Sequence, residues 1–303
     1  MRIVFWGTPA FALPALRALG DEGFDVLAVV TQPDRPAGRG REVQPSAVKQ
    51  QAGKEGIPVL QPESARDPAF VAALRGLKPD LSIVVAYGQI LKPEVLSIPR
   101  LGSINIHGSL LPELRGAAPV QWAIIRGLEL TGVTIMKMDA GLDSGPMLLR
   151  VEEPIEADEA ACELSGRLAE IGAEALIEAL ELVEDNGLVP EEQDHARATY
   201  APKLGREQAR LDWSLPAVEV SRWIRGLDDT PGAWSPLEGT GPVKLFRPVP
   251  DGAAGAPGTV LETRDDGIVV ACGDGSLVIG EVQPPGKRRM TAAEWVRGRG
   301  VSA

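Results

Sequence analysis

Cysteine is scarce in this chain of 303 residues, and its scarcity excludes two kinds of architecture. Cys162 and Cys272 lie in different halves, and neither belongs to a C-x-x-C pair. A disulfide framework needs paired cysteines, and a structural zinc site needs clustered thiolates or imidazoles, so neither is predicted. We therefore expect no bound metal and a reducing compartment, the cytoplasm.

Long apolar runs are also missing. No stretch reaches the roughly 18 apolar residues that a membrane-spanning helix requires. The N-terminus, MRIVFW, enters a predicted strand at once and lacks the three regions of a signal peptide. With 44% hydrophobic and 24% charged residues, the composition predicts a globular protein, and the length favours two domains.

Nucleotide-binding and nucleic-acid-binding signals are weak. The chain has no G-x-G-x-x-G after its first strand and no Walker A sequence, only a single-glycine turn at Gly7-Thr8-Pro9. The net charge of −11 argues against a nucleic-acid partner, because phosphate contacts need lysine and arginine.

The charge is nevertheless uneven along the chain. Residues 206–303 hold 12 basic and 13 acidic residues, whereas residues 1–205 hold 19 and 29. The basic residues form two local clusters, Arg35, Arg39 and Arg41 in one loop and Lys287, Arg288 and Arg289 near the end. Such patches on an acidic protein can still bind a polyanion.

The first half of the chain alternates strands and helices. Hydrophobic patterning predicts strands at 2–6, 25–31, 57–60, 81–86 and 103–107, with helices over 9–19, 46–55, 66–76 and 93–97. This alternation predicts a parallel sheet with crossover helices. Strands at 132–138 and 147–153 predict a hairpin at one sheet edge. Residues 32–45 are predicted to form a long loop, either functional or merely a crossover.

The second half changes character after a long predicted helix at 158–184. Residues 186–205 show no periodicity and are interpreted as a linker. After a helix at 216–227, strands are expected at 242–249, 257–263, 267–272 and 275–283, the rhythm of a small barrel or sandwich. We therefore divide the chain into a catalytic domain at 1–186, a linker at 187–205 and a C-terminal domain at 206–303.

The stretch 102–119 holds the strongest candidate site. Asn105 and His107 are two residues apart on a predicted strand, so they point to the same side. His107 is one of two histidines, the other being His195. Parallel sheets place sites at the carboxyl ends of strands, where Tyr87-Gly88 and the loop with Asp143 are also expected.

Three side chains there suggest one chemistry. Asn105 and His107 can donate hydrogen bonds to an oxyanion, and Asp143 can fix the histidine tautomer or accept a proton. No serine or cysteine is placed as a nucleophile, which favours direct transfer. The alternative is structural: Asn105 and His107 cap a loop, and Asp143 caps a turn.

Several motifs carry a resemblance that spans nearly the whole chain. The sequence resembles methionyl-tRNA formyltransferases, members of the 10-formyltetrahydrofolate-dependent formyltransferase family. The matching segments are IVFWGTPAFA at 3–12, TQPDRPAGRG at 31–40, VVAYGQIL at 84–91, INIHGSLLPELRGAAPVQWA at 104–123, TGVTIMKMDAGLDSG at 131–145, YAPKL at 200–204 and LDWS at 211–214.

The resemblance implies a fold and an activity. It implies an α/β protein with a Rossmann-like parallel or mixed sheet in the N-terminal formyltransferase domain and a small C-terminal OB-like β-barrel. The implied reaction transfers a formyl group from 10-formyltetrahydrofolate, a co-substrate, to the α-amine of methionyl initiator tRNA for translation initiation. The implied state is a monomer without membrane contact.

The resemblance and the local patterns together give a set of expected site residues. They are Asn105, His107 and Asp143 for catalysis; Ser109, Leu110, Leu111, Pro112, Tyr87 and Gly88 for the folate; and Arg35, Arg39, Arg41, Lys287, Arg288 and Arg289 for tRNA. Relatives often carry a basic residue where this chain has Glu113.

Two other functions compete with this one. Relatives that formylate a sugar-nucleotide amine, or that hydrolyse the same folate, are expected to share the Asn-His-Asp site. They are not expected to carry the Arg35–Arg41 loop together with this C-terminal domain. An RNA-binding module with a degenerate enzyme core is a further alternative, which the intact Asn105, His107 and Asp143 disfavour.

Overall fold

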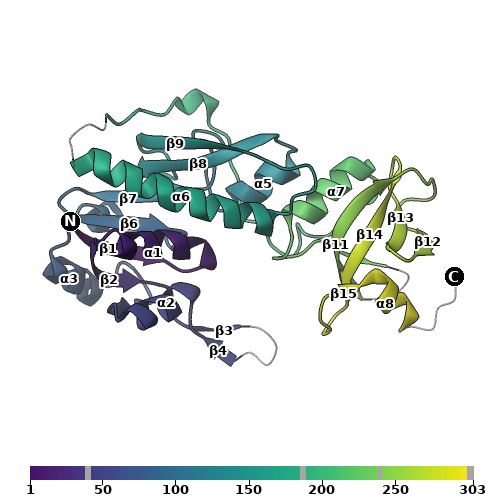
Figure 1. Ribbon diagram of the computed structural model, residues 1–303, viewed down its shortest axis with the longest axis horizontal. Coiled ribbons are helices and arrows are strands. Elements are labelled where there is room, and N and C mark those ends of the chain that lie inside the picture. The colour runs from purple at the N-terminus through teal and green to yellow at the C-terminus, as the bar shows by residue number, and fades with distance from the viewer. Residues whose placement is uncertain (38–41, 185–188, 238–240, 299–303) are drawn as a thin grey trace. The chain divides into compact units, whose positions relative to one another are not determined.

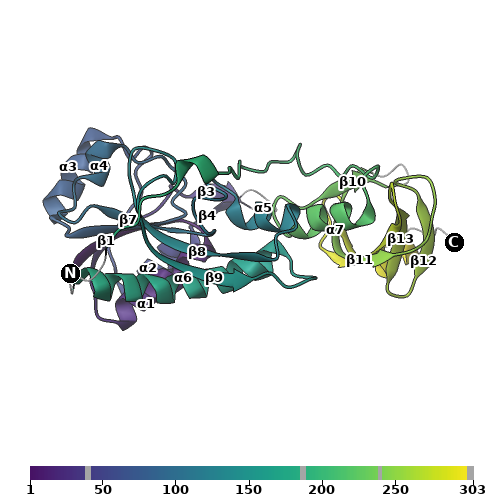
Figure 2. The same cartoon turned by 90° about the horizontal axis from the view of Figure 1, so that it is seen from above.

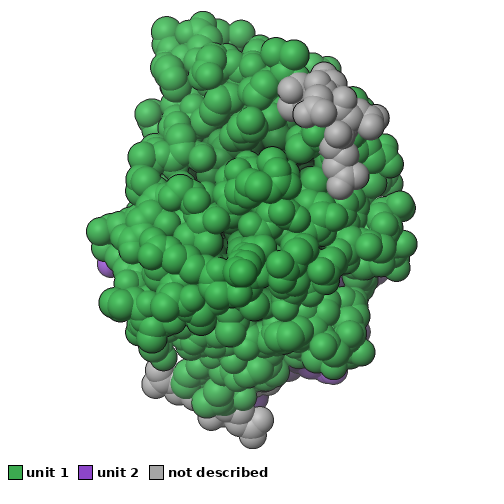
Figure 3. Space-filling model, turned by 90° about the vertical axis from the view of Figure 1, so that its left-hand side faces the viewer, with its two compact units in different colours: residues 1–119, 130–154, 165–200 green, residues 120–129, 155–164, 201–303 purple. Residues whose placement is uncertain are grey.

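The computed structural model describes residues 1–37, 42–184, 189–237 and 241–298. These residues form two compact units, coloured in Figure 3. The first unit contains residues 1–119, 130–154 and 165–200, and the second contains 120–129, 155–164 and 201–303. The domain boundaries expected at 186 and 206 stay a prediction. Among the described residues, no helix is long and apolar enough to cross a membrane.

A seven-stranded mixed sheet forms the centre of the first unit (Figure 1). Its spatial order is β5-β2-β1-β6-β7-β8-β9. The first five strands are parallel, and β8 pairs antiparallel with both β7 and β9. The strands are β1 (Arg2–Gly7), β2 (Asp25–Val30), β5 (Val59–Leu60), β6 (Leu81–Val85), β7 (Ser103–His107), β8 (Leu130–Lys137) and β9 (Met147–Pro154). The predicted parallel sheet and edge hairpin are both confirmed.

Helices cover both faces of this sheet. Figures 1 and 2 show α1 and α6 along one face and α3 and α4 across the other. The helices that begin in this unit's residues are α1 (Leu13–Asp21) after a 3₁₀ turn (Ala10–Ala12), α2 (Ala47–Glu55), α3 (Pro68–Leu77), α4 (Pro93–Leu96) and α5 (Pro119–Ile125). The long α6 (Ala161–Glu184) starts just before this unit's residues resume at Ser165. The Asp67 carboxylate caps α3 by accepting from Ala69 N and Phe70 N, and Pro68 occupies the first turn, where its missing N–H costs nothing.

Strand register decides which side chains share a face. Trp6 pairs with Val84 and Val84 with Asn105, so all three point toward α3 and α4. Trp6 and Val84 belong to the apolar core there, together with Phe70 and Tyr87. Ile106, one residue on, points the other way, toward Gly172 of α6.

The described part of the segment 32–45 differs from the expected loop. It forms a two-stranded ribbon of β3 (Arg35–Ala37) and β4 (Glu42–Gln44), in which Pro36 lies opposite Val43. Its base is fixed because Asp34 accepts from Lys49 Nζ at 2.5 Å and from Gln61 Nε2 at 2.7 Å. The proline and glycine content suggests irregular backbone, but an isolated ribbon tolerates proline because both strands are edges.

The second unit contains an antiparallel sheet of six strands, the small barrel-like domain that the strand rhythm predicts. Its order is β10-β11-β14-β13-β12, with β15 pairing with β14. The elements are α7 (Ala217–Gly226), β10 (Trp234–Pro236), β11 (Pro242–Asp251), β12 (Val260–Arg264), β13 (Gly267–Ala271), β14 (Ser276–Gln283), β15 (Met290–Thr291) and α8 (Ala292–Arg297). The patterning misses β10, β15 and α8 because each is short. A capping box formed by Thr291 and Glu294 starts α8.

Because β8 packs closely on β9 at Gly132, adding one methyl group there should lower the stability of the fold. A Cβ at Gly132 would overlap the Val151 carbonyl oxygen and lie 2.7 Å from Leu110 Cδ2. We expect Gly132→Ala to lower the free energy of unfolding by about 2 kcal/mol, measured by urea titration. A Cβ at Gly53 in α2 would have no heavy atom within 4 Å. Gly53→Ala should therefore raise the free energy of unfolding by about 0.5 kcal/mol. Equal stability of the two variants would contradict the packing.

Candidate active site

Asn105 and His107 lie at the carboxyl end of β7 and point to one side, as their spacing predicts. Both are buried, with 9% and 5% of their surface exposed. The neighbouring β8 presents Met136 opposite Asn105 and Thr134 opposite His107. The two polar side chains are therefore buried beside one apolar and one polar neighbour, where hydrogen bonds are stronger than in water.

The His107 ring is oriented by a main-chain carbonyl. Its Nε2 lies 3.0 Å from the oxygen of Leu114. A carbonyl can only accept, so Nε2 carries the proton of the neutral ring and Nδ1 presents a lone pair. Nδ1 lies 3.8 Å from Asp143 Oδ2, within ion-pair reach but beyond a hydrogen bond. The hydrogen bond that orients the ring is therefore made to Leu114, and the expected effect of Asp143 on the ring stays a prediction.

Asp143 is held in place from within the same unit. Its backbone has φ of +49°, a left-handed conformation that is strained for a residue with a Cβ. Its Oδ2 accepts from the N–H of Gly116 at 2.9 Å. The loop before it is tied by Asp139, whose carboxylate accepts from Gly141 N and Ser144 Oγ. The carboxylate is thus aimed at the imidazole by its surroundings.

Asn105 supplies an uncommitted amide. Its side chain makes no hydrogen bond to any residue that the structure describes. Beside it, protonation of His107 on Nδ1 would create an N–H donor facing Asp143. An amide, an imidazole and a carboxylate on neighbouring segments can stabilise a developing oxyanion and accept a proton. The structure brings the three expected catalytic side chains to one edge of the sheet.

The expected folate segment follows directly after β7. Thr134 Oγ1 donates to Ser109 O at 2.7 Å and accepts from Leu111 N at 3.1 Å. The Ser109 hydroxyl donates to Glu113 O, and the bond between Leu111 and Pro112 is cis. Leu111 packs with Met136 and Met147. Only Leu110 among the four is half-buried rather than buried, so a ligand would meet Leu110 and main-chain groups.

Tyr87 and Gly88 lie at the end of the adjacent strand, β6. The Tyr87 carbonyl accepts from Thr8 Oγ1 and Gln32 Nε2. Its ring packs edge-on against Trp6 at 5.2 Å, and its hydroxyl is buried without a partner among the described residues. Burial raises the pKa of this hydroxyl to about 12. The Tyr87 ring therefore belongs to the core, and this strand end offers main-chain groups instead.

The expected tRNA-contacting residues divide into three groups. Arg35, Lys287 and Arg288 are exposed. Arg39 and Arg41 lie outside the described residues. Arg289 is committed to its own unit, because its guanidinium donates to both Asp228 oxygens, at 2.9 and 3.2 Å, and to Glu281.

Arg289 also stacks on the ring of Phe246, with its Cζ 3.9 Å from the ring centroid. Its partner Asp228 is buried, and burial raises the pKa of that carboxyl although Arg289 opposes the rise. A lone basic run in the sequence does not reveal such pairing, since the partners lie eight and sixty-one residues away. We therefore remove Arg289 from the expected phosphate contacts.

Sequence patterning misses one part of this neighbourhood. Gln193, in the segment interpreted as a linker, donates to the carbonyls of Asp143 and Gly145. Arg115 donates to Gln193 and to His195 Nδ1. No periodicity marks these residues, because each acts through a single side chain on irregular backbone.

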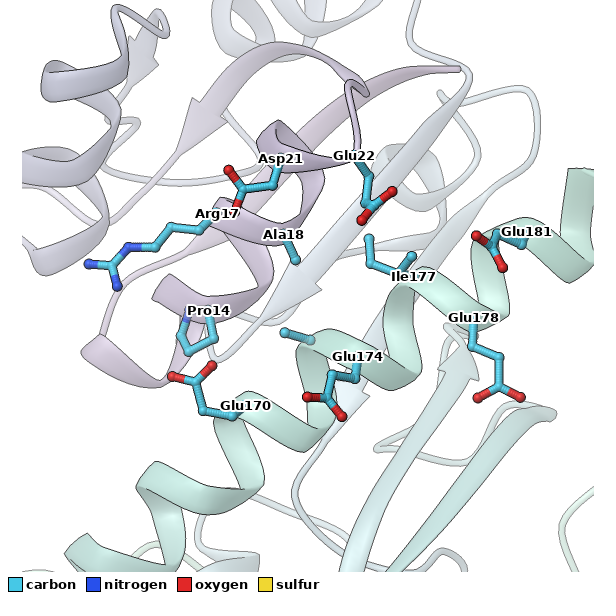
Figure 4. Close-up of a pocket in the computed structure, with 11 residues that line it drawn as sticks. Pro14, Arg17, Ala18, Asp21, Glu22, Glu170, Glu174, Ile177, Glu178 and Glu181 are labelled. Carbon is cyan, nitrogen blue, oxygen red and sulfur yellow. The ribbon is translucent and has the colours of Figure 1, made fainter.

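A separate groove of about 550 Å³ lies between α1 and α6 (Figure 4). It adjoins the helix that packs on Ile106, so it opens on the sheet face opposite to Asn105 and His107. One basic residue, Arg17, and six acidic residues line it: Asp21, Glu22, Glu170, Glu174, Glu178 and Glu181. Among the described residues, no group of three histidine, cysteine, aspartate or glutamate side chains could hold a metal ion.

Two family models match the chain. The formyl transferase model matches residues 1–180, and the model of the formyl transferase C-terminal domain matches residues 203–300. Together they account for both units of the structure apart from short connecting stretches.

Curated relatives are similar along the full length. A methionyl-tRNA formyltransferase of Citrifermentans bemidjiense is 50% identical over 298 residues, covering 98% of this chain and 93% of its own. One from Pseudomonas putida strain GB-1 is 50% identical over 299 residues, covering 99% and 96%.

Solved structures share the fold at lower identity. HypX from Aquifex aeolicus, in complex with tetrahydrofolic acid, matches with a TM-score of 0.71 and 22% identity over 98% of this chain and 47% of its own. WlaRD, a sugar 3N-formyl transferase, matches with a TM-score of 0.68 and 18% identity over 95% and 99%. At such identities the likeness concerns the fold alone.

The pairing of Arg289 predicts a stability effect in place of a binding effect. Arg289→Met should lower the free energy of unfolding by about 3 kcal/mol, because it leaves the buried Asp228 carboxylate uncompensated. Arg288→Met removes the same charge from an exposed site and should change stability by less than about 0.5 kcal/mol. The free energy of unfolding of both variants is measured by urea titration. An Arg289→Met variant as stable as Arg288→Met would refute the structural role.

Proposed function

Because the chain belongs to the methionyl-tRNA formyltransferase family, we propose that it transfers the formyl group of 10-formyltetrahydrofolate to the α-amine of methionyl initiator tRNA. The observation that carries the proposal is the meeting of Asn105, His107 and Asp143 at one sheet edge. The identity of about 50% over nearly the whole chain supports the same acceptor.

The proposed reaction is a direct attack. The free amine of the methionyl group forms a bond to the formyl carbon, and the formyl oxygen gains negative charge. The tetrahedral intermediate then breaks the bond from that carbon to N10 of the folate. N10 leaves as a neutral secondary amine, because it takes up the proton that Asp143 has received from the attacking nitrogen. Asp143 accepts the proton that the attacking nitrogen loses, directly or through a water.

The tautomer of His107 assigns the donors of this step. Its Nε2–H group already donates to the Leu114 carbonyl. A hydrogen bond from this ring to the formyl oxygen must therefore come from the Nδ1–H group of the protonated ring. The Asp143 carboxylate, 3.8 Å away, stabilises that positive charge. The uncommitted Asn105 amide is the second donor. Together they would hold the oxyanion as it forms.

The folate is proposed to lie along residues 109–112, with the strand end at Tyr87 and Gly88 beside it. Two features support this placement. Hydrogen bonds to Thr134 hold the main chain of Ser109 and Leu111 in place, and the half-buried Leu110 offers an apolar surface for a flat ring. When bound, 10-formyltetrahydrofolate supplies the activated formyl group. Leu111 and Pro112 are buried, and they support the segment from the side of the protein core.

The tRNA is proposed to contact basic residues of both units. Arg35, Arg39 and Arg41 are assigned to its acceptor end, and Lys287 and Arg288 to backbone phosphates. We further propose that the protein acts as a monomer in the cytoplasm. Cations such as the exposed Arg35, Lys287 and Arg288 on an acidic chain concentrate the attraction for phosphates in a few places.

Loss of a catalytic side chain should lower turnover strongly. We expect His107→Ala to reduce kcat by about 100-fold to 1,000-fold, the usual cost of losing one oxyanion donor. Asp143→Ala should reduce kcat by about 100-fold or more, the usual contribution of a general base. The measurement is formylation of charged initiator tRNA with the folate donor, and circular dichroism verifies folding. Asp25→Ala, at an exposed strand start, is the matched control.

Near-normal formylation by either variant would contradict the proposed catalytic role of the residue that it replaces. The same assay with a free amino-sugar nucleotide as acceptor separates the proposed substrate from the competing one. Preference for the sugar nucleotide would overturn the proposed acceptor while leaving the formyl chemistry in place.

The salt dependence of tRNA binding tests the assigned phosphate contacts. Replacing Lys287 and Arg288 with alanine should weaken binding and flatten the slope of log K against log salt by up to about two units. Lys54→Ala with Arg66→Ala removes equal charge from exposed sites elsewhere and should leave the slope unchanged. An unaltered slope in the Lys287/Arg288 variant would exclude that patch.

A further inference from the structure

The backbone of residues 189–200 contains one 3₁₀ turn (His195–Arg197), is otherwise irregular, and is attached to the rest of the first unit by hydrogen bonds. Glu191 exchanges two main-chain hydrogen bonds with Met147 of β9, both 2.8 Å long. Further along, the Thr199 carbonyl accepts from Arg115 N at 2.9 Å. The segment is therefore anchored on both sides of Gln193, beside the two loops that contain Asp143 and Leu114.

Gln193 is buried between those loops, with 4% of its surface exposed. Its Nε2 donates to the Asp143 carbonyl at 3.0 Å and to the Gly145 carbonyl at 2.7 Å. Its Oε1 accepts from Arg115 Nε at 3.0 Å and from Nη2 at 2.6 Å. Both amide hydrogens and the oxygen are thus in use.

The chemistry of the partners allows only one orientation of this amide. Arg115 can only donate, and the two carbonyls can only accept. A flipped amide would place its nitrogen against the guanidinium and its oxygen against two carbonyls. Arg115 is itself 5% exposed and has no carboxylate partner among the described residues, so its burial is supported by Gln193 and His195.

The same segment also steadies the group that orients His107. Leu114 N donates to Thr199 Oγ1 at 2.9 Å, while Leu114 O accepts from the imidazole. The carboxylate of Asp143 is fixed by Gly116 N, but its strained backbone needs a second restraint. Gln193 provides that restraint at the Asp143 carbonyl.

We propose that Gln193 is a positioning residue for Asp143, setting the distance between its carboxylate and His107 and acting on turnover through that distance alone. The inference rests on the proposed function, since it assumes that Asp143 serves formyl transfer. Arg115 has a supporting part, because its donors fix the direction in which the Gln193 amide points.

Gln193→Glu tests this with almost no change in shape. The carboxylate keeps both contacts to Arg115 but turns two donor bonds into repulsion between oxygens. We expect kcat to fall about 10-fold to 100-fold, as for a misplaced reacting group, with KM for tRNA and folate changed less than about threefold. Gln51→Glu on α2, whose amide is hydrogen-bonded to Arg17 and Glu55 among the described residues, is the matched control and should keep full activity.

A double-mutant cycle separates positioning from general stability. In a chain that already carries Asp143→Ala, Gln193→Glu should lower kcat by less than about twofold, since the group that it positions is gone. A full 10-fold further loss in that background would overturn the proposal. So would a Gln193→Glu variant with normal kcat beside an inactive Asp143→Ala variant. Normal activity of Asp143→Ala would instead refute the proposed catalytic role itself.

Hydrogen exchange supplies a readout that does not depend on activity. The Gly116 N–H donates to Asp143 Oδ2, so displacement of the loop should speed its exchange at least 10-fold in Gln193→Glu. Gln193→Met, which removes the amide without adding charge, should do the same if the glutamate variant folds poorly. Unchanged exchange at Gly116 in a folded variant would count against the proposal.

Discussion

The arrangement of the candidate site depends on the hydrogen bond between His107 Nε2 and the Leu114 carbonyl, which orients the imidazole ring. It decides which ring nitrogen carries the proton, and so which nitrogen faces Asp143. Leu114 has φ of +57°, so the chain turns sharply where its carbonyl meets the imidazole. The cis bond at Pro112, the Thr134 contacts and the bond from Leu114 N to Thr199 all act on this short turn.

Much of this arrangement is visible in the sequence. Asn105 and His107 alternate with Ile104 and Ile106, and a period of two on a strand separates polar from apolar faces. The parallel sheet follows from buried strands alternating with helices, and parallel sheets place polar strand ends at one edge. The pairing of these particular side chains therefore follows from local patterns combined with one rule of topology.

Other parts could not be predicted, because they depend on single contacts across long sequence separations. Arg289 looks like a surface cation until Asp228, sixty-one residues earlier, is placed beside it. Gln193 lies in a segment without periodicity, and only its partners show what it does. The strands Arg35–Ala37 and Glu42–Gln44 follow Asp34, whose contacts with Lys49 and Gln61 no local propensity reveals.

The acidic groove between α1 and α6 has a consequence for how a polyanion approaches. Six carboxylates face solvent there against one guanidinium, so phosphates within a Debye length of about 8 Å meet a repulsive potential. Within the proposed function, this repulsion would disfavour approach of the tRNA to the face opposite to His107. For the proposed tRNA substrate, the net charge of −11 would thus act more strongly against some directions of approach than against others.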